Sequence, residues 1–130
     1  MVSDRIGDML NRLKNAGAVS HKSVSVPYSR LNLEILKLLA EYGFIVSFEK
    51  NSQKATNFID VVIAYKNDKP RIRGIERVSK QSRRVYKAVK DIRRVKEGYG
   101  MEVISTPKGL KTDSEARKEK VGGEALFRIW

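Results

Sequence analysis

The order in which helical and strand-like patterns follow one another is what most constrains the fold of this chain. Apolar side chains recur at helical spacing over residues 3–16 and 31–42, whereas residues 23–26, 44–48 and 58–65 show strand-type patterns. A parallel sheet of the α/β class requires strands and helices in regular alternation, which this order lacks. We therefore predict the α+β class, with helices packed on largely antiparallel sheets.

Local signals predict where the two N-terminal helices begin and end. Ser3 is a candidate N-cap for the first helix, and Gly17 follows its last apolar position. Ser29 is placed to cap the second helix, and Gly43 is placed to end it in the left-handed conformation.

The second half of the chain also mixes strands and helix without a regular alternation. Thr112 and Glu115 fit the T-x-x-E capping box that starts a helix, and the pair Gly122-Gly123 follows that helix. We expect a weaker strand near 71–78, a short turn capped by Asp91, a strand over 101–104, a loop over 105–109, a helix over 113–119 and a strand over 125–130.

Positive charge is concentrated in one central segment. The chain carries a formal net charge of +12, and residues 71–96 hold 11 basic side chains against two acidic ones. A surplus gathered in this way is typical of a binding patch for nucleic acid, for an anionic membrane face or for an acidic protein. The alternative interpretation is a solvated basic face without a partner.

A chain of 130 residues makes one ordinary domain or two small ones. If the chain forms two α+β domains, the change in charge places their boundary near residue 70, between an N-terminal domain over residues 1–69 and a C-terminal domain over 70–130. A hairpin between residues 58–65 and 71–78 would instead move the boundary to about residue 79.

Several function classes lack the residues they need. There is no cysteine, so thiolate zinc sites and a cysteine nucleophile are excluded, and His21 is the only histidine. No phosphate-binding glycine loop or metalloprotease motif is present. A ribonuclease would have to pair His21 with a distant carboxylate. We predict no enzyme activity, cofactor, metal or small-molecule substrate, and a cytoplasmic rather than membrane location, since no apolar run reaches the length of a bilayer span.

Two stretches carry the chemistry of nucleic-acid binding. Arg83, Arg84 and Lys87 flank Tyr86, so cations can hold phosphates while the ring stacks on a base. The alternative is that Tyr86 belongs to the core and its neighbour Val85 is exposed. The second stretch is the loop over 105–109, which contains Ser105, Thr106, Lys108 and Gly109. The two adjacent hydroxyls can donate and accept hydrogen bonds, the lysine supplies a positive charge, and the glycine lets the backbone come close to a ligand.

The first predicted helix has a polar face that includes Asp4, Arg12 and Asn15. Asn and Arg on an exposed helix face can contact sugar and phosphate groups, and a plain solvated face is the alternative.

These stretches resemble a known family. Residues 103–109, Thr112-Asp113, 115–117 and 121–124 closely resemble the C-terminal signature of the eighth small-subunit ribosomal protein family in its bacterial form. The start of the chain, around residues 4–16, and the middle, over 77–80 and 83–86, resemble the family as well. The resemblance spans the whole chain.

The resemblance implies two α+β domains, of which the C-terminal one, over residues 70–130, is the RNA-binding domain that makes the main specific contacts. It also implies a primary RNA-binding protein that docks on a helix in the central domain of small-subunit ribosomal RNA and helps to assemble it. It implies other small-subunit ribosomal proteins as neighbours and, in some bacteria, the messenger RNA of its own operon as a second target. A general basic nucleic-acid-binding protein is the alternative. By position, the implied RNA contacts are Ser105, Thr106, Lys108, Gly109, Tyr86 and Glu124, with Asp4, Arg12 and Asn15 of the N-terminal helix.

The chain departs from the family pattern at three places. Pro107 stands where the family usually has serine, which removes one hydroxyl and stiffens the loop. Arg5 stands where proline is usual, and Gln81-Ser82 replaces a usual Pro-Gly turn.

Overall fold

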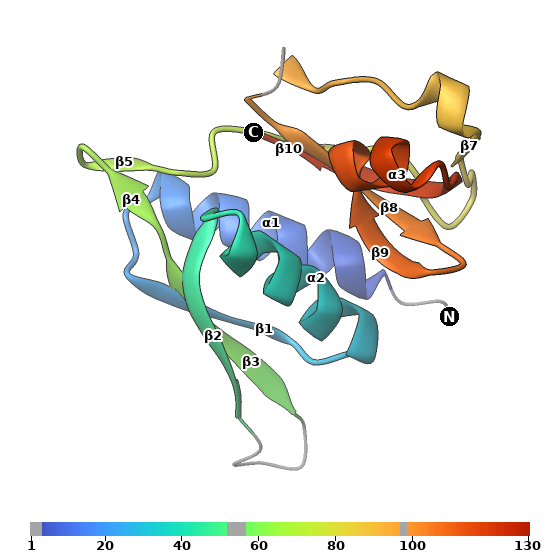
Figure 1. The fold of residues 1–130 in the computed structure, drawn as a ribbon. Helices are drawn as coiled ribbons and strands as arrows, with labels where there is room; N and C mark the ends of the chain where they lie inside the picture. The colour runs from blue at the N-terminus through green and yellow to red at the C-terminus, as the bar shows by residue number, and fades with distance from the viewer. Residues whose placement is uncertain (1–3, 52–56, 97–98) are drawn as a thin grey trace. The chain divides into compact units, whose positions relative to one another are not determined.

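The computed structural model describes residues 4–51, 57–96 and 99–130, and the chain divides into two compact units (Figure 1). Unit 1 is Met1–Arg73 and unit 2 is Gly74–Trp130. The division after residue 73 lies between the two boundaries, near 70 and near 79, that the sequence leaves open. Both units combine helices with antiparallel strands, so the predicted α+β class is confirmed.

Unit 1 places two helices against a three-stranded antiparallel sheet in the order β1-β3-β2, with a small hairpin after it (Figure 1). α1 contacts β1, α2 contacts β2, and the helices contact each other. The elements are α1 (Arg5–Ala18), β1 (Ser23–Pro27), α2 (Arg30–Glu41), β2 (Ile45–Asn51), β3 (Phe58–Ile63), β4 (Tyr65–Lys66) and β5 (Lys69–Pro70).

The core of unit 1 follows directly from the two sequence periods. The helical stripe of α1, which includes Met9 and Leu13, is almost fully buried. In β3 the alternate residues Ile59, Val61 and Ile63 are buried, as the period of two predicts. The apolar stripe of α1 and the apolar face of β3 therefore both contribute to the core between the helices and the sheet.

The ends of α1 differ from the expectation, whereas those of α2 agree with it. Asp4, not Ser3, caps α1, because its carboxylate accepts a 2.9 Å hydrogen bond from the amide of Gly7; Ser3 lies outside the described residues. Gly17 lies inside the helix and not after it. A Cβ on Gly17 would come 3.1 Å from the Cβ of Pro70, so glycine permits β5 to approach α1 closely.

Unit 2 is built on a five-stranded antiparallel sheet centred on β10 (Figure 1). On one side β10 pairs with β8, which pairs with β9; on the other side it pairs first with β7 and then with β6. The elements are β6 (Ile75–Arg77), β7 (Tyr86–Lys87), the 3-10 turn η1 (Val89–Asp91), β8 (Met101–Thr106), β9 (Gly109–Thr112), α3 (Asp113–Glu119) and β10 (Gly123–Ile129).

Several expectations for unit 2 need correction. The weak strand near 71–78 is only the three residues of β6, and it pairs with β10 inside unit 2. Asp91 does not cap a turn but is the last residue of η1. The loop over 105–109 is the end of a hairpin, because Ser105 and Thr106 belong to β8 and Gly109 begins β9. At α3 the Thr112 capping box is confirmed, but the left-handed residue at its end is Lys120, not a glycine.

Candidate nucleic-acid interface

Three of the predicted contact residues lie side by side across the sheet of unit 2. In the strand register Glu124 of β10 stands opposite Tyr86 of β7 and also opposite Ser105 of β8. Residues directly opposite each other in antiparallel strands project from the same face, so the three side chains form one row. The Tyr86 residue is 71% exposed, which rules out the alternative that it belongs to the core.

The turn between β8 and β9 presents Lys108 beside this row. Pro107 and Lys108 are exposed at its tip, and Gly109 follows with a φ of 105°, a conformation that side chains other than glycine rarely adopt. The hydroxyl of Thr106 accepts a 3.1 Å hydrogen bond from the amide of Lys108 and donates a 2.7 Å bond to the carbonyl of Gly109. The turn is therefore held in one shape by its own residues.

The two adjacent hydroxyls consequently have different roles. Thr106 is 8% exposed, and its proton is already donated to Gly109, so it shapes the turn and is not free to donate to a ligand. Ser105 is half-buried, and within the described part of the chain its hydroxyl makes no hydrogen bond. Ser105 is the hydroxyl that can reach a partner.

Two glycines make this arrangement of strands possible. A Cβ on Gly123 would fall 2.1 Å from the carbonyl oxygen of Ser105, and a Cβ on Gly122 would fall 2.4 Å from that of Lys87. Any side chain there would push β10 away from β8 or β7. The sequence pointed to this pair only as the end of the preceding helix; glycines at the start of a strand also signal a close backbone approach.

The basic residues around Tyr86 are not all free cations. A terminal nitrogen of Arg84 lies 3.2 Å from a carboxylate oxygen of Glu124 and orients that side chain. Lys87 is held at 3.0 Å by Glu102, with only 16% of its side chain exposed. Arg83 is exposed and has no ion-pair partner among the residues that the structure describes. Of the three cations predicted to hold phosphates, Arg83 is therefore the most available.

Glu102 is a buried carboxylate that sequence reasoning missed. It is 1% exposed and binds Lys87 and also Arg128, whose Nε donates to it at 2.8 Å. This bond, with lesser contributions from the charges of Glu102 and Glu76, raises the pKa of Arg128 above its ordinary value. The available signal was a glutamate at an interior position of an apolar strand. The network joins β6, β7, β8 and β10 near the predicted contact surface.

The predicted N-terminal contacts lie in unit 1, where most already have a partner. Asp4 is the helix cap. The Nε of Arg12 donates to Asp8 at 2.9 Å, and its Nη1 donates to the carbonyl of Ser25 at 3.2 Å. Asn15 is exposed, and its side chain makes no hydrogen bond within the described segments.

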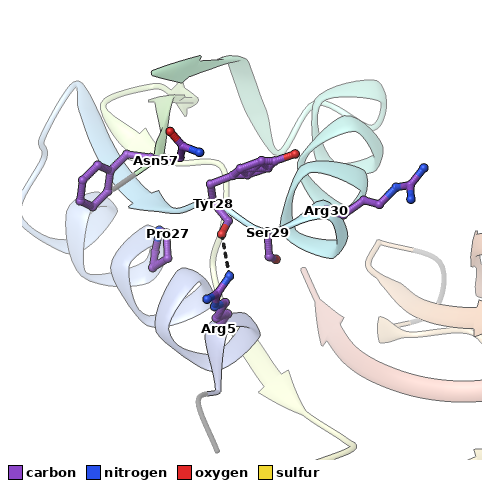
Figure 2. A pocket seen from close by; sticks show the side chains of 7 residues that line it. Arg5, Pro27, Tyr28, Ser29, Arg30 and Asn57 are labelled. Carbon is purple, nitrogen blue, oxygen red and sulfur yellow. Dashed lines mark hydrogen bonds between the residues drawn. The ribbon is translucent and has the colours of Figure 1, made fainter. Parts of the chain in front are cut away.

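A basic hollow of about 470 Å³ in unit 1 was also not predicted (Figure 2). Arg5 and Arg30 line it, together with the ring of Tyr28 and the amide of Asn57. Nη1 of Arg5 donates a 3.1 Å hydrogen bond to the carbonyl of Tyr28, drawn as a dashed line in Figure 2. Lys50 lies 4.2 Å from the centroid of the same ring. Arginines beside an aromatic ring are a combination that suits nucleic acid.

The described residues offer little to other ligand classes. No three histidine, aspartate or glutamate side chains among them gather into a metal-binding group. None of the helices in the described segments is long and apolar enough to cross a bilayer.

Comparison with known proteins gives a consistent family. The profile described as ribosomal protein S8 matches residues 4–130. The chain is 42% identical over 130 residues to the small ribosomal subunit protein uS8 of Mycoplasma mobile, and the matched region covers 100% of this chain and 98% of the relative. It is 43% identical over 138 residues to the uS8 protein of Thermus aquaticus, with 100% of both chains covered. The chain therefore belongs to the ribosomal protein S8 family.

Proposed function

We propose that this chain binds the central domain of small-subunit ribosomal RNA through unit 2 and helps that RNA to assemble. Its relatives are named as proteins of the small ribosomal subunit, and the family is structural, not enzymatic, as the sequence predicts. The observation that carries the proposal is the row formed by Tyr86, Glu124 and Ser105, beside the rigid turn that presents Lys108.

The chemistry of this surface suits an irregular RNA helix. The major groove of A-form RNA is too deep and narrow for side chains, so recognition relies on the minor groove and on unpaired bases. The exposed ring of Tyr86 offers a stacking platform, and the hydroxyl of Ser105 can bond a base edge or a ribose 2′-OH. Lys108 and Arg83 supply charges for phosphates. We also propose Asp4, the N-cap of α1, and Arg12 and Asn15 within α1 as secondary contacts.

Replacing Ser105 with alanine is expected to weaken binding to the central-domain RNA by about 1–3 kcal/mol, because a specific hydrogen bond is lost. Binding to an unrelated RNA of equal length should stay unchanged. Filter binding with both RNAs measures the difference. Ser114→Ala removes an exposed hydroxyl from α3 and serves as the control. Equal losses on both RNAs would contradict a role in specific recognition.

Replacing Tyr86 with alanine should cost about 1–3 kcal/mol of binding to the same RNA, because a base loses its stacking partner. Tyr86→Phe should retain most of the affinity, since the ring is preserved. Tyr99, at 82% exposure, provides a matched control in the same unit, and Tyr99→Ala should leave binding intact. If the Tyr86 and Tyr99 variants bound equally well in filter assays, Tyr86 would have no part in the interface.

The remaining expectations belong to the same proposal. We propose the two units as the two domains that the sequence predicts, ribosomal proteins of the same subunit as neighbours in the cytoplasmic ribosome, and the operon messenger RNA as a further target. The alternative, a general basic nucleic-acid-binding protein, requires equal affinity for double-stranded DNA. Competition of DNA against central-domain RNA at moderate salt separates the two.

A further inference from the structure

A second basic hollow, of about 380 Å³, lies in unit 2 and is not used by the proposed interface. Five cations line it: Lys87, Arg93, Arg94, Lys96 and Arg128. Among the described residues, Glu76 is the single acidic residue in its lining.

Most of this charge is not neutralised within the described part of the chain. Lys87 and Arg128 share the buried carboxylate of Glu102, and Arg128 also meets Glu76 at 3.1 Å. The other three cations, Arg93, Arg94 and Lys96, are exposed and form no ion pair with any described residue. The hollow therefore has three cations available to a ligand, beside two that are already held in place.

The indole of Trp130 forms a fixed wall of the hollow. Trp130 and Gly74 exchange two backbone hydrogen bonds of 3.0 and 3.1 Å. A Cβ on Gly74 would fall 2.5 Å from the indole, and a Cβ on Gly100 would fall 2.8 Å from the Cβ of Trp130. The Trp130 side chain therefore occupies space that a side chain at either glycine would fill. Nζ of Lys96 lies 4.6 Å from the ring centroid.

Strand geometry separates this hollow from the proposed interface. Tyr86 and Lys87 are consecutive in β7, and successive side chains of a strand project from opposite faces. Lys87 and Arg128 both reach Glu102, so this network lies on the face opposite to Tyr86. A ligand in the hollow consequently contacts a different face of the sheet from the row of Tyr86, Glu124 and Ser105.

We propose that the hollow is a second RNA site, which binds phosphate groups of the backbone without reading sequence. Guanidinium groups such as those of Arg93 and Arg94 match phosphate oxygens with paired hydrogen bonds. Among the described residues, the two carboxylates near the hollow, Glu76 and Glu102, are already bonded to cations. A phosphodiester chain supplies one negative charge per nucleotide, which matches three adjacent cations better than isolated carboxylates do. The choice of RNA as ligand rests on the proposed function.

The sole tryptophan of the chain makes the proposal measurable. Because Trp130 lines the hollow, titration with oligouridylate should change its fluorescence to saturation, and added salt should reverse the change. The double variant Arg93→Ala/Arg94→Ala should require about tenfold more RNA or lose the response, and the slope of log affinity against log salt should fall by about 1.4. The double variant Lys90→Ala/Lys118→Ala removes equal charge from exposed residues that do not line the hollow, and it should keep the response.

The outcomes distinguish this inference from the proposed function. A response of the arginine variant equal to wild type, or an equal response of wild type to a glutamate-rich peptide, would overturn the phosphate site. Ser105→Ala should leave the response to oligouridylate unchanged, because that ligand is held on the other face. If the wild type bound central-domain RNA no more tightly than an unrelated RNA, with the oligouridylate response intact, the proposed function would be refuted and the second site would stand. Circular dichroism verifies that each variant is folded.

Discussion

Glu102→Ala is expected to destabilise unit 2 by about 3–5 kcal/mol, the usual cost of breaking a buried ion pair from one side. Glu102 is 1% exposed and is bonded to Lys87 at 3.0 Å and to Arg128 at 2.8 Å. Its removal leaves both cations without this shared carboxylate, and Lys87, with 16% of its side chain exposed, can recover little hydration.

Urea denaturation followed by Trp130 fluorescence measures this loss, because the only tryptophan belongs to unit 2. Lys87→Ala is the matched control: it leaves Glu102 paired with Arg128 and should therefore cost clearly less than Glu102→Ala. Glu102→Gln, which keeps the size but not the charge, should fall between wild type and alanine. A loss below about 1 kcal/mol for Glu102→Ala would contradict a stabilising role for the network.

Gly123→Ala is expected to damage both the stability of unit 2 and its RNA affinity. The added methyl would lie 2.1 Å from the carbonyl oxygen and 2.9 Å from the carbonyl carbon of Ser105. These are backbone atoms, so the clash can be relieved only by moving β10 away from β8. Overpacking of this kind costs about 1–3 kcal/mol or more. Displacement of β10 also separates Glu124 from Ser105, so binding to the central-domain RNA should fall.

The same urea titration and filter assay test this expectation. Gly43→Ala is a suitable control, because nothing lies within 4 Å of the added methyl and the residue belongs to unit 1. Its φ of 81° makes alanine unfavourable, but the Trp130 transition and the RNA affinity should be unchanged. Wild-type values for Gly123→Ala in both assays would refute the close-packing argument.

Much of the secondary structure could be predicted because its causes are local. Ser29 and Thr112 cap their helices through amides three residues later, and the alternation in β3 reflects one buried face. The errors have local causes too. Asp4 stands next to Ser3, and both residue types are common N-caps. In the β8–β9 hairpin the second strand, β9, has only four residues, so its sequence pattern is easily taken for a loop.

The candidate site was only partly predictable. The sequence named the hydroxyls and cations of the proposed interface but could not distinguish Ser105 from Thr106, because the hydrogen bonds of the turn depend on its folded shape. It also treated Lys87 as a free phosphate ligand, whereas a carboxylate 15 residues away holds it. The row across three strands and both basic hollows involve residues far apart in the chain.

The amino-acid sequence by itself determined the α+β class, the N-terminal caps of α2 and α3, the buried periodicities, the concentration of positive charge and the resemblance to a ribosomal protein family. These depend on neighbouring residues or on composition, so they require no knowledge of the fold. Only the tertiary structure decided which cations are neutralised, which hydroxyl is free and which side chains share a face of the sheet. Those properties arise from strand register and burial, which bring together residues that the chain order keeps apart.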